Sequence, residues 1–194
     1  MSAVDSSASI AAGADQASGR GPGSSGTGDG SGHGAADPVH KALAYILRST
    51  QSRPQSEAEI AAKLRSREIP DDVAADAIAR AKKIRAIDDE AFARAWVEDR
   101  GRQRGFGVAR LRQELRRRQL SEGLIADALQ QLDGRDDFTV AVQLARTRFR
   151  QLPASLEPDA AARRLAAFLA RRGYPPALSQ RAAMTVSGLD RRWD

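Results

Sequence analysis

The sequence predicts an all-α protein made of three tandem units, each containing three helices. Apolar residues recur at helical spacing through nearly all of residues 38–187, and no segment has the pattern of a strand. The apolar pattern also repeats at a period of about 50 residues, which is typical of stacked helical repeats. We therefore expect an elongated body, curved if successive units are rotated. The predicted helices span residues 38–52, 56–67, 71–86, 88–102, 107–118, 121–132, 136–150, 158–172 and 175–187.

The helix starts of the first unit are marked by capping residues. Asp37 precedes a proline, a pair that suits the N-cap and the first position of a helix. Ser56 and Glu59 have the spacing of a capping box. Either Asp71 or Asp72 is expected to cap the third helix, whose apolar face comprises Val73, Ala77, Ile78, Ala81 and Ile84.

Four apolar positions recur in every unit at offsets of 0, 4, 9 and 13 residues. We predict repeats at residues 37–86, 87–133 and 134–188, followed by a C-terminal tail at 189–194. Residues 1–36 are mostly Gly, Ser, Ala and Asp and contain too little apolar surface to fold, so we expect a disordered tail. The recurring positions are Ile60, Leu64, Ile69 and Val73, then Leu111, Leu115, Leu120 and Leu124, then Leu165, Leu169, Tyr174 and Leu178.

Charge and composition favour an anionic partner over a catalytic role. The net charge is +6; residues 1–37 hold four acidic residues and one basic residue, a net −3, which leaves +9 for the remainder. A basic, arginine-rich body suits nucleic acid or an acidic protein surface. The chain has no cysteine, no apolar run near membrane-spanning length and no secretory pattern at its N-terminus, so we expect a cytoplasmic location.

Eight arginines lie between residues 100 and 118, against a single acidic residue, Glu114. A solvated helix face usually mixes both signs of charge, so this cluster indicates contact with a polyanion or an acidic surface. The alternative is an ordinary exposed face whose arginine stems cover apolar neighbours. Arg146 and Arg150 share a face of the seventh predicted helix and could extend the same surface. The central arginines are Arg100, Arg102, Arg104, Arg110, Arg112, Arg116, Arg117 and Arg118.

Two aromatic residues of this region have alternative roles. Phe106 stands between two glycines and could stack on a base or fill a partner pocket. Alternatively, Gly107 is an N-cap and Phe106 packs against Leu111 as a hydrophobic staple, which we favour. For Trp96, on an apolar stripe with Val97, we favour a core position over an interface.

Candidates for catalysis or metal binding are weak. The acidic run Asp88-Asp89-Glu90 opens a helix, where carboxylates are favoured without any chemical role. His33 and His40 have no Cys, Asp or Ser partner at a diagnostic spacing. We therefore expect no enzyme activity and no cofactor.

The central block resembles the signature of the RecX regulatory proteins. The residues that carry the resemblance are Asp88-Asp89-Glu90-Ala91-Phe92-Ala93-Arg94-Ala95-Trp96-Val97, Arg100, Gly105-Phe106-Gly107 and Arg110-Leu111-Arg112-Gln113-Glu114-Leu115. The resemblance covers roughly residues 38–186. It implies three tandem three-helix repeats that bind RecA within the groove of its filament on single-stranded DNA. It further implies modulation, mostly inhibition, of RecA ATPase, strand exchange and coprotease activity, without catalysis or a cofactor.

The chain departs from the family pattern in two places. The family often has Lys-Gly-Ile where this chain has Arg118-Gln119-Leu120, and loss of that glycine is expected to reshape the helix end. The long Gly/Ser tail is an addition with no family role. Two rival functions remain at this point: a stand-alone basic helical nucleic-acid-binding protein, and a scaffold for another acidic protein.

Overall fold

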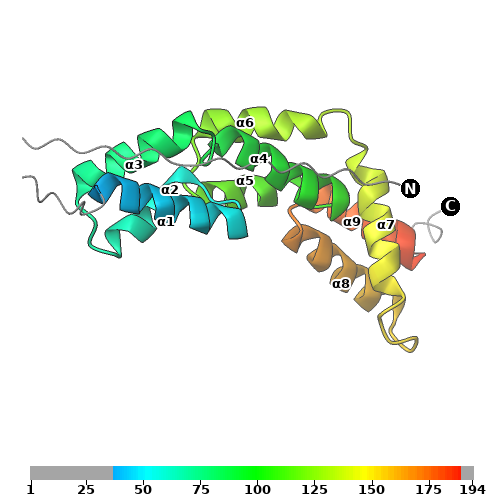
Figure 1. The fold of residues 1–194 in the computed structure, drawn as a ribbon. Coiled ribbons are helices and arrows are strands. Elements are labelled where there is room, and N and C mark those ends of the chain that lie inside the picture. Colours follow the sequence, from blue (N-terminus) through cyan, green and yellow to red (C-terminus); the bar gives the residue numbers. More distant parts are fainter. Residues whose placement is uncertain (1–36, 189–194) are drawn as a thin grey trace, which may run out of the picture. The chain divides into compact units, whose positions relative to one another are not determined.

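The computed structural model of the protein describes residues 37–188. In that range all the predicted helices are present and there is no strand (Figure 1). The predicted tails at 1–36 and 189–194 lie outside the described residues. The α-helices are α1 (Pro38–Ser52), α2 (Glu57–Arg65), α3 (Asp71–Lys83), α4 (Asp89–Val97), α5 (Val108–Arg117), α6 (Glu122–Leu129), α7 (Asp137–Phe149), α8 (Pro158–Arg171) and α9 (Pro176–Ser187).

Three hydrophobic cores form, one within each set of three consecutive helices. We call α1–α3, α4–α6 and α7–α9 the first, second and third units. The first two recurring apolar positions are fully buried in every unit, with 0% exposure, so the predicted repeat is confirmed. These residues are Ile60 and Leu64, Leu111 and Leu115, and Leu165 and Leu169.

The predicted caps are confirmed at α1 and α2 and wrong at α3. The Asp37 side chain accepts a hydrogen bond from the Val39 backbone, and both halves of the Ser56–Glu59 capping box are formed. At α3 the N-cap is Pro70, so neither Asp71 nor Asp72 caps the helix. The fixed φ of proline sets the helix entry there, and both carboxylates lie in the first turn instead.

Two predicted helices end differently in the structure. Ile84, predicted on the apolar face of the third helix, follows the end of α3 and is 57% exposed. The predicted helix 88–102 is α4 followed by a π-helical segment, η1 (Glu98–Gln103). Gly101 within η1 packs so closely that a Cβ there would lie 3.1 Å from Leu111 and Leu132 side-chain atoms. A wider turn accommodates this contact. A short 3₁₀ segment, η2 (Gln130–Leu132), follows α6.

The second helix of each unit ends in a left-handed residue: Glu68, Gln119 or Gly173. At Gln119 the φ angle is 59°. The Gln119 N–H donates to the Arg116 carbonyl, and the Leu120 N–H donates to the Leu115 carbonyl. These are the two bonds of a Schellman ending. The expectation that replacing glycine reshapes this end is therefore wrong, because the bonds and the burial of Leu120 retain the left-handed turn.

Candidate partner-binding surface

Several of the central arginines form ion pairs with acidic residues outside the stretch 100–118. Within that stretch the sequence has eight arginines and one acidic residue, Glu114, but carboxylates on either side of it also reach the arginines. Exposed ion pairs of this kind contribute little to stability, yet they reduce the positive charge offered to a partner. The pairs are Arg102 with Glu98 at 3.5 Å, Arg104 with Asp99 at 3.1 Å and Arg116 with Glu122 at 2.5 Å.

Trp96 contacts two arginines at the edge of the second core. The guanidinium carbons of Arg100 and Arg118 lie 4.0 and 4.1 Å from ring centroids of Trp96. The indole Nε1 donates to Glu114 Oε2 at 3.1 Å, and the ring stacks on Phe92. The prediction that Trp96 packs on the core is confirmed.

Arg118 also joins the first and second units. The Ser56 hydroxyl donates to the Arg118 carbonyl at 2.9 Å, and the Arg118 guanidinium donates to Glu59 Oε1 at 2.5 Å. The Glu57 backbone N–H donates to Asp89 Oδ1 at 2.8 Å, and burial raises the pKa of the Asp89 carboxyl. We call this set of contacts the first junction.

The acidic run at 88–90 has the structural role expected of a helix start. Asp88 is the N-cap of α4, and its side chain accepts a hydrogen bond from the Ala91 N–H. That bond, helped by the Arg85 guanidinium, lowers the pKa of the Asp88 carboxyl. Within residues 37–188, no group of three or more His, Asp or Glu side chains is arranged to hold a metal ion.

The second and third units meet through backbone groups and through side chains that donate to backbone carbonyls, at what we call the second junction. The Gly107 N–H donates to the Arg172 carbonyl at 2.8 Å. The Tyr174 hydroxyl donates to the Gly105 carbonyl at 2.9 Å, and burial raises the pKa of Tyr174 to about 12, so this donor stays protonated. A Cβ on Gly173 would lie 2.5 Å from the Arg110 backbone nitrogen. A side chain at position 173 would therefore clash with the backbone at Arg110, so the two backbone segments can approach this closely only because residue 173 is glycine.

Phe106 lies inside this second junction. The guanidinium carbons of Arg110 and Arg172 lie 4.1 and 5.2 Å from its ring centroid. Gly107 is the N-cap of α5, as predicted, and Phe106 packs against the core cluster that contains Leu111. The ring is half-buried under two arginines, which restricts its access to a partner.

Arg112 and Arg117 are different from the other central arginines. Both are exposed, and neither forms an ion pair within residues 37–188, although the charge of Arg112 helps Arg116 to lower the pKa of Glu122. Arg117 borders a groove of about 460 Å³ between α5 and the end of α8, which we call the junction groove. Its other lining residues are Ala109, Arg110, Gln113, Glu114, Ala170, Arg171 and Gly173.

Arg146 and Arg150 are also exposed and without an acidic partner among the described residues. Arg146 lies in α7, and Arg150 is its C-cap. No hydrogen bond, ion pair or shared groove in this part of the chain connects them to the arginines of α5.

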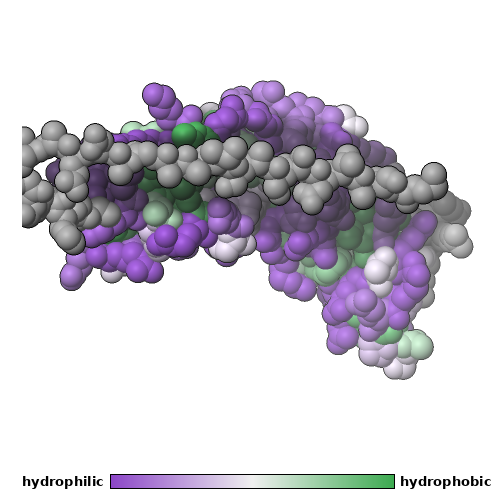
Figure 2. Space-filling model, viewed as in Figure 1, coloured by the Kyte–Doolittle hydropathy of each residue, from purple (hydrophilic) through white to green (hydrophobic). Residues whose placement is uncertain are grey.

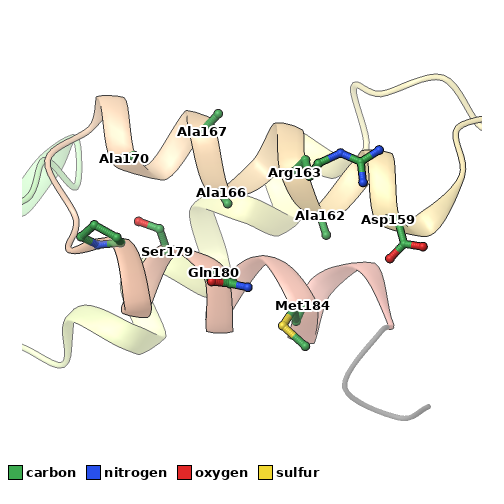
Figure 3. A pocket seen from close by; sticks show the side chains of 10 residues that line it. Asp159, Ala162, Arg163, Ala166, Ala167, Ala170, Ser179, Gln180 and Met184 are labelled. Atoms are coloured by element: carbon green, nitrogen blue, oxygen red, sulfur yellow. The ribbon is translucent and has the colours of Figure 1, made fainter. Parts of the chain in front are cut away.

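A larger cavity, of about 660 Å³, lies between α8 and α9 (Figure 3). Alanines of α8 form much of its wall, with Met184 of α9 and the charged Asp159 and Arg163 near one end. None of the predicted partner-binding residues lines it. The face seen in Figure 2 is mostly hydrophilic, and within residues 37–188 no helix has the length and hydrophobicity needed to cross a membrane.

Sequence reasoning missed several residues that build the junctions. Arg135 donates to the Gly101 and Phe106 carbonyls at 2.7 and 3.2 Å, and Arg172 donates to the Arg104 carbonyl at 2.6 Å. Gly173 had a usable signal, because it occupies the position of Gln119, where the family pattern has glycine.

Comparisons with known proteins identify the same family in all three units of the chain. Family models described as the first, second and third three-helix domains of RecX match residues 42–80, 88–129 and 135–182. A Streptomyces coelicolor protein named Regulatory protein RecX is 37% identical over 145 residues, which are 75% of this chain and 77% of the relative. A Mycolicibacterium smegmatis protein of the same name is 38% identical over 131 residues, covering 66% of this chain and 70% of the relative.

Two solved structures have a similar fold. A crystal structure of regulatory protein RecX has a TM-score of 0.60 at 25% identity, covering 74% of this chain and 70% of the other. RecX from Lactobacillus salivarius has a TM-score of 0.63 at 18% identity, covering 78% of this chain and 97% of the other, and this likeness concerns the fold alone.

Proposed function

Because this chain belongs to the RecX family of regulatory proteins, we propose that it binds RecA and RecA filaments on single-stranded DNA. We propose that binding modulates, and mainly inhibits, RecA ATPase, strand exchange and coprotease activity. The match of the family models to all three units carries this proposal. We propose a cytoplasmic location, where such filaments form.

The arrangement of α5 supports direct contact through exposed arginines. Arg112 and Arg117 form no ion pair within residues 37–188, so their charge is available to carboxylates or phosphates. Arg116 is exposed but shared with Glu122, and Arg110 is shared with Glu114. We assign the partner contact to these four residues, with Arg112 and Arg117 foremost.

The remaining predicted partner-binding residues have other contacts. Arg100, Phe106 and Arg118 stabilise the second unit and its junctions, so we propose that they act by keeping α5 in place. Arg102 and Arg104 are paired within their own segment and contribute a weaker field. Arg146 and Arg150 would provide a separate basic contact on α7.

A mechanism follows from a body that is fixed at both junctions. If it contacts neighbouring RecA subunits, it favours one relative placement of those subunits over others. A ligand shifts a conformational equilibrium only through such differential binding. The subunit movements that accompany ATP turnover would then be hindered.

The direct test is to add the full chain to preformed RecA–single-stranded DNA filaments and to follow ATP hydrolysis. We expect hydrolysis to fall at chain concentrations well below that of RecA, and the effect to weaken as salt rises. Unchanged hydrolysis, with helicity verified by circular dichroism, would contradict the proposal. If the chain then binds single-stranded DNA tightly without RecA, the nucleic-acid-binding alternative is favoured.

A pair of double variants tests the assignment of the contact. Arg112→Ala/Arg117→Ala should raise the concentration needed for half-inhibition about 10-fold, equivalent to about 1.4 kcal/mol. The matched control is Arg80→Ala/Lys83→Ala, which removes the same charge from exposed positions of α3. Equal effects of both variants would show that general charge, rather than the α5 face, governs binding.

A further inference from the structure

The second helices of the three units are joined end to end. At the first junction, the N-cap of α2 donates through the Ser56 hydroxyl to the Arg118 carbonyl at the end of α5. At the second junction, the N-cap of α5 donates through the Gly107 N–H to the Arg172 carbonyl at the end of α8. The donors occupy equivalent positions in the repeat, and so do the acceptors. Helix α5 therefore links α2 and α8 (Figure 1).

The arginine at each of these helix ends does two things. It stacks on aromatic side chains, and its guanidinium donates into the unit whose helix start sits on it. Arg118 covers Trp96 and donates to Glu59 of the first unit. Arg172 lies over Phe106 and donates to the Arg104 carbonyl of the second unit.

The first unit has the same helix end, and no other helix start within residues 37–188 is seated on it. Arg67 precedes the left-handed Glu68, and its guanidinium carbon lies 4.3 Å from the ring centroid of Tyr45. Within residues 37–188, Arg67 has no acidic partner and its carbonyl oxygen accepts no hydrogen bond. Among the described residues, the Arg67 carbonyl is thus an open acceptor, and the guanidinium, whose neighbour is the Tyr45 side chain, is not paired with a carboxylate.

The opposite end of the series is closed by the chain itself. Helix α8 begins about one turn earlier than its counterparts α2 and α5. Ala161, which holds the position of Ser56 and Gly107, is 1% exposed, and its N–H donates to the Glu157 carbonyl at 2.9 Å. A second copy therefore cannot seat this position of its α8 on the open end of α2.

We propose that the open end of α2 binds the N-terminus of a helix on the protein partner, with a Ser, Thr or Gly N-cap and a carboxylate at its third position. The N-cap would donate to the Arg67 carbonyl, and the carboxylate would pair with the Arg67 guanidinium, as Ser56 and Glu59 do with Arg118. This inference rests on the proposed function, in which the partner is RecA. A phosphodiester would satisfy only the guanidinium, because it has no donor for the carbonyl.

Binding measurements on the full chain test the proposal. Fluorescently labelled wild type and Arg67→Glu are titrated with RecA–single-stranded DNA filaments and, separately, with single-stranded DNA alone. The matched control, Arg65→Glu, makes the same charge change at an exposed position of α2 that has no ion pair in the described residues. We expect Arg67→Glu to weaken filament binding about 10-fold or more, as for loss of a directly paired charge. The control should change it less than about 3-fold.

Three other outcomes of these titrations would contradict the proposal. Equal effects of the two variants would remove Arg67 from the interface. A parallel loss of binding to naked DNA would assign Arg67 to phosphate and overturn the helix-docking proposal. Failure of the wild type to bind filaments would overturn the proposed function, and this inference with it.

Crosslinking identifies what lies on the open end. The chain has no cysteine, so Ser66→Cys, at an exposed residue beside Arg67, can carry a single benzophenone label. We expect adducts on RecA in the first turn of a helix with a carboxylate at its third position. Adducts to DNA alone, to other parts of RecA or to neither would contradict the proposal.

Discussion

The two junctions share one plan and differ in the chemistry that carries it out. The first uses side chains: the Ser56 hydroxyl, the Glu59 carboxylate and the Asp89 carboxylate. The second uses close backbone approach, since a Cβ on Gly107 would lie 2.4 Å from the Gly173 carbonyl oxygen. The second junction also has side-chain donors, from Tyr174, Arg135 and Arg172, but they bond to backbone carbonyls that only glycine allows to approach. The second solution leaves less room for substitution.

The aspartates at the start of each following unit show the same contrast. Asp89 accepts directly from the Glu57 N–H of the first unit. Asp137, at the equivalent position, accepts instead from Arg135, whose guanidinium donates to the Phe106 carbonyl. One junction makes a direct bond where the other interposes an arginine.

The largest expected effect is at the backbone junction. Gly173→Ala should destabilise the protein by about 2–5 kcal/mol, because it adds a left-handed strain and a clash with Arg110. Urea unfolding measures this change. Gly134→Ala is the control: its φ is also positive, at +77°, but nothing lies within 4 Å, so only about 1–2 kcal/mol should be lost. Equal losses would mean that the close approach carries no energetic weight.

The side-chain junction should respond less. Ser56→Ala removes a helix cap and the bond to Arg118, so we expect a loss of about 1–3 kcal/mol in thermal or urea unfolding. Ser121→Ala removes a cap on α6 that has no hydrogen bond to another unit among the described residues, and should lose only about 1 kcal/mol. If the two losses match, the bond between units contributes nothing measurable.

A smaller change of opposite sign is expected at the end of α5. Gln119→Gly should stabilise the protein by about 0.5–1 kcal/mol, since glycine adopts φ near 59° without strain but has more freedom when unfolded. Gln113→Gly, in the exposed interior of the same helix, should instead destabilise it by about 1 kcal/mol. Destabilisation by both substitutions would show that Gln119 makes a favourable contact that outweighs its backbone strain.

The adjacent acids of α4 should show opposite dependences on pH. Burial raises the pKa of Asp89, so its ionisation disfavours folding at neutral pH, and this penalty disappears as pH falls through the ordinary carboxyl range near 4. The stability of Asp89→Asn relative to wild type should therefore be more favourable at pH 7 than at pH 4.5. The pKa of Asp88 is lowered by its bond from Ala91, so Asp88→Asn should lose stability at pH 7 and progressively less on acidification. The same pH trend for both would be inconsistent with these environments.

Local signals predicted the helices, whereas contacts distant in sequence determined the site. Periodicity and capping located α1 and α2 because the responsible residues lie within one or two turns of each other. The pairs Arg102–Glu98, Arg104–Asp99 and Arg116–Glu122 are local, and they were missed because these acids lie just outside the arginine-rich stretch. The contacts that join the units were missed because Arg118 and Glu59 are 59 residues apart and Arg172 and Arg104 are 68 apart. The π-helical turn of η1 likewise depends on packing against Leu132, from beyond α6. The apolar repeat predicted the three-unit plan and the family resemblance implied the same plan, but neither indicated the junction chemistry.

The end-to-end arrangement of α8, α5 and α2 has an electrostatic consequence. Each helix carries a partial positive charge at its N-terminus and a partial negative charge at its C-terminus, from aligned peptide dipoles. Where Gly107 meets Arg172 and where Ser56 meets Arg118, opposite ends adjoin and largely cancel. The free negative pole of this series lies at the end of α2, where the positive charges of Arg65 and Arg67 adjoin it, and salt should screen that exposed pole far more than the two buried ones.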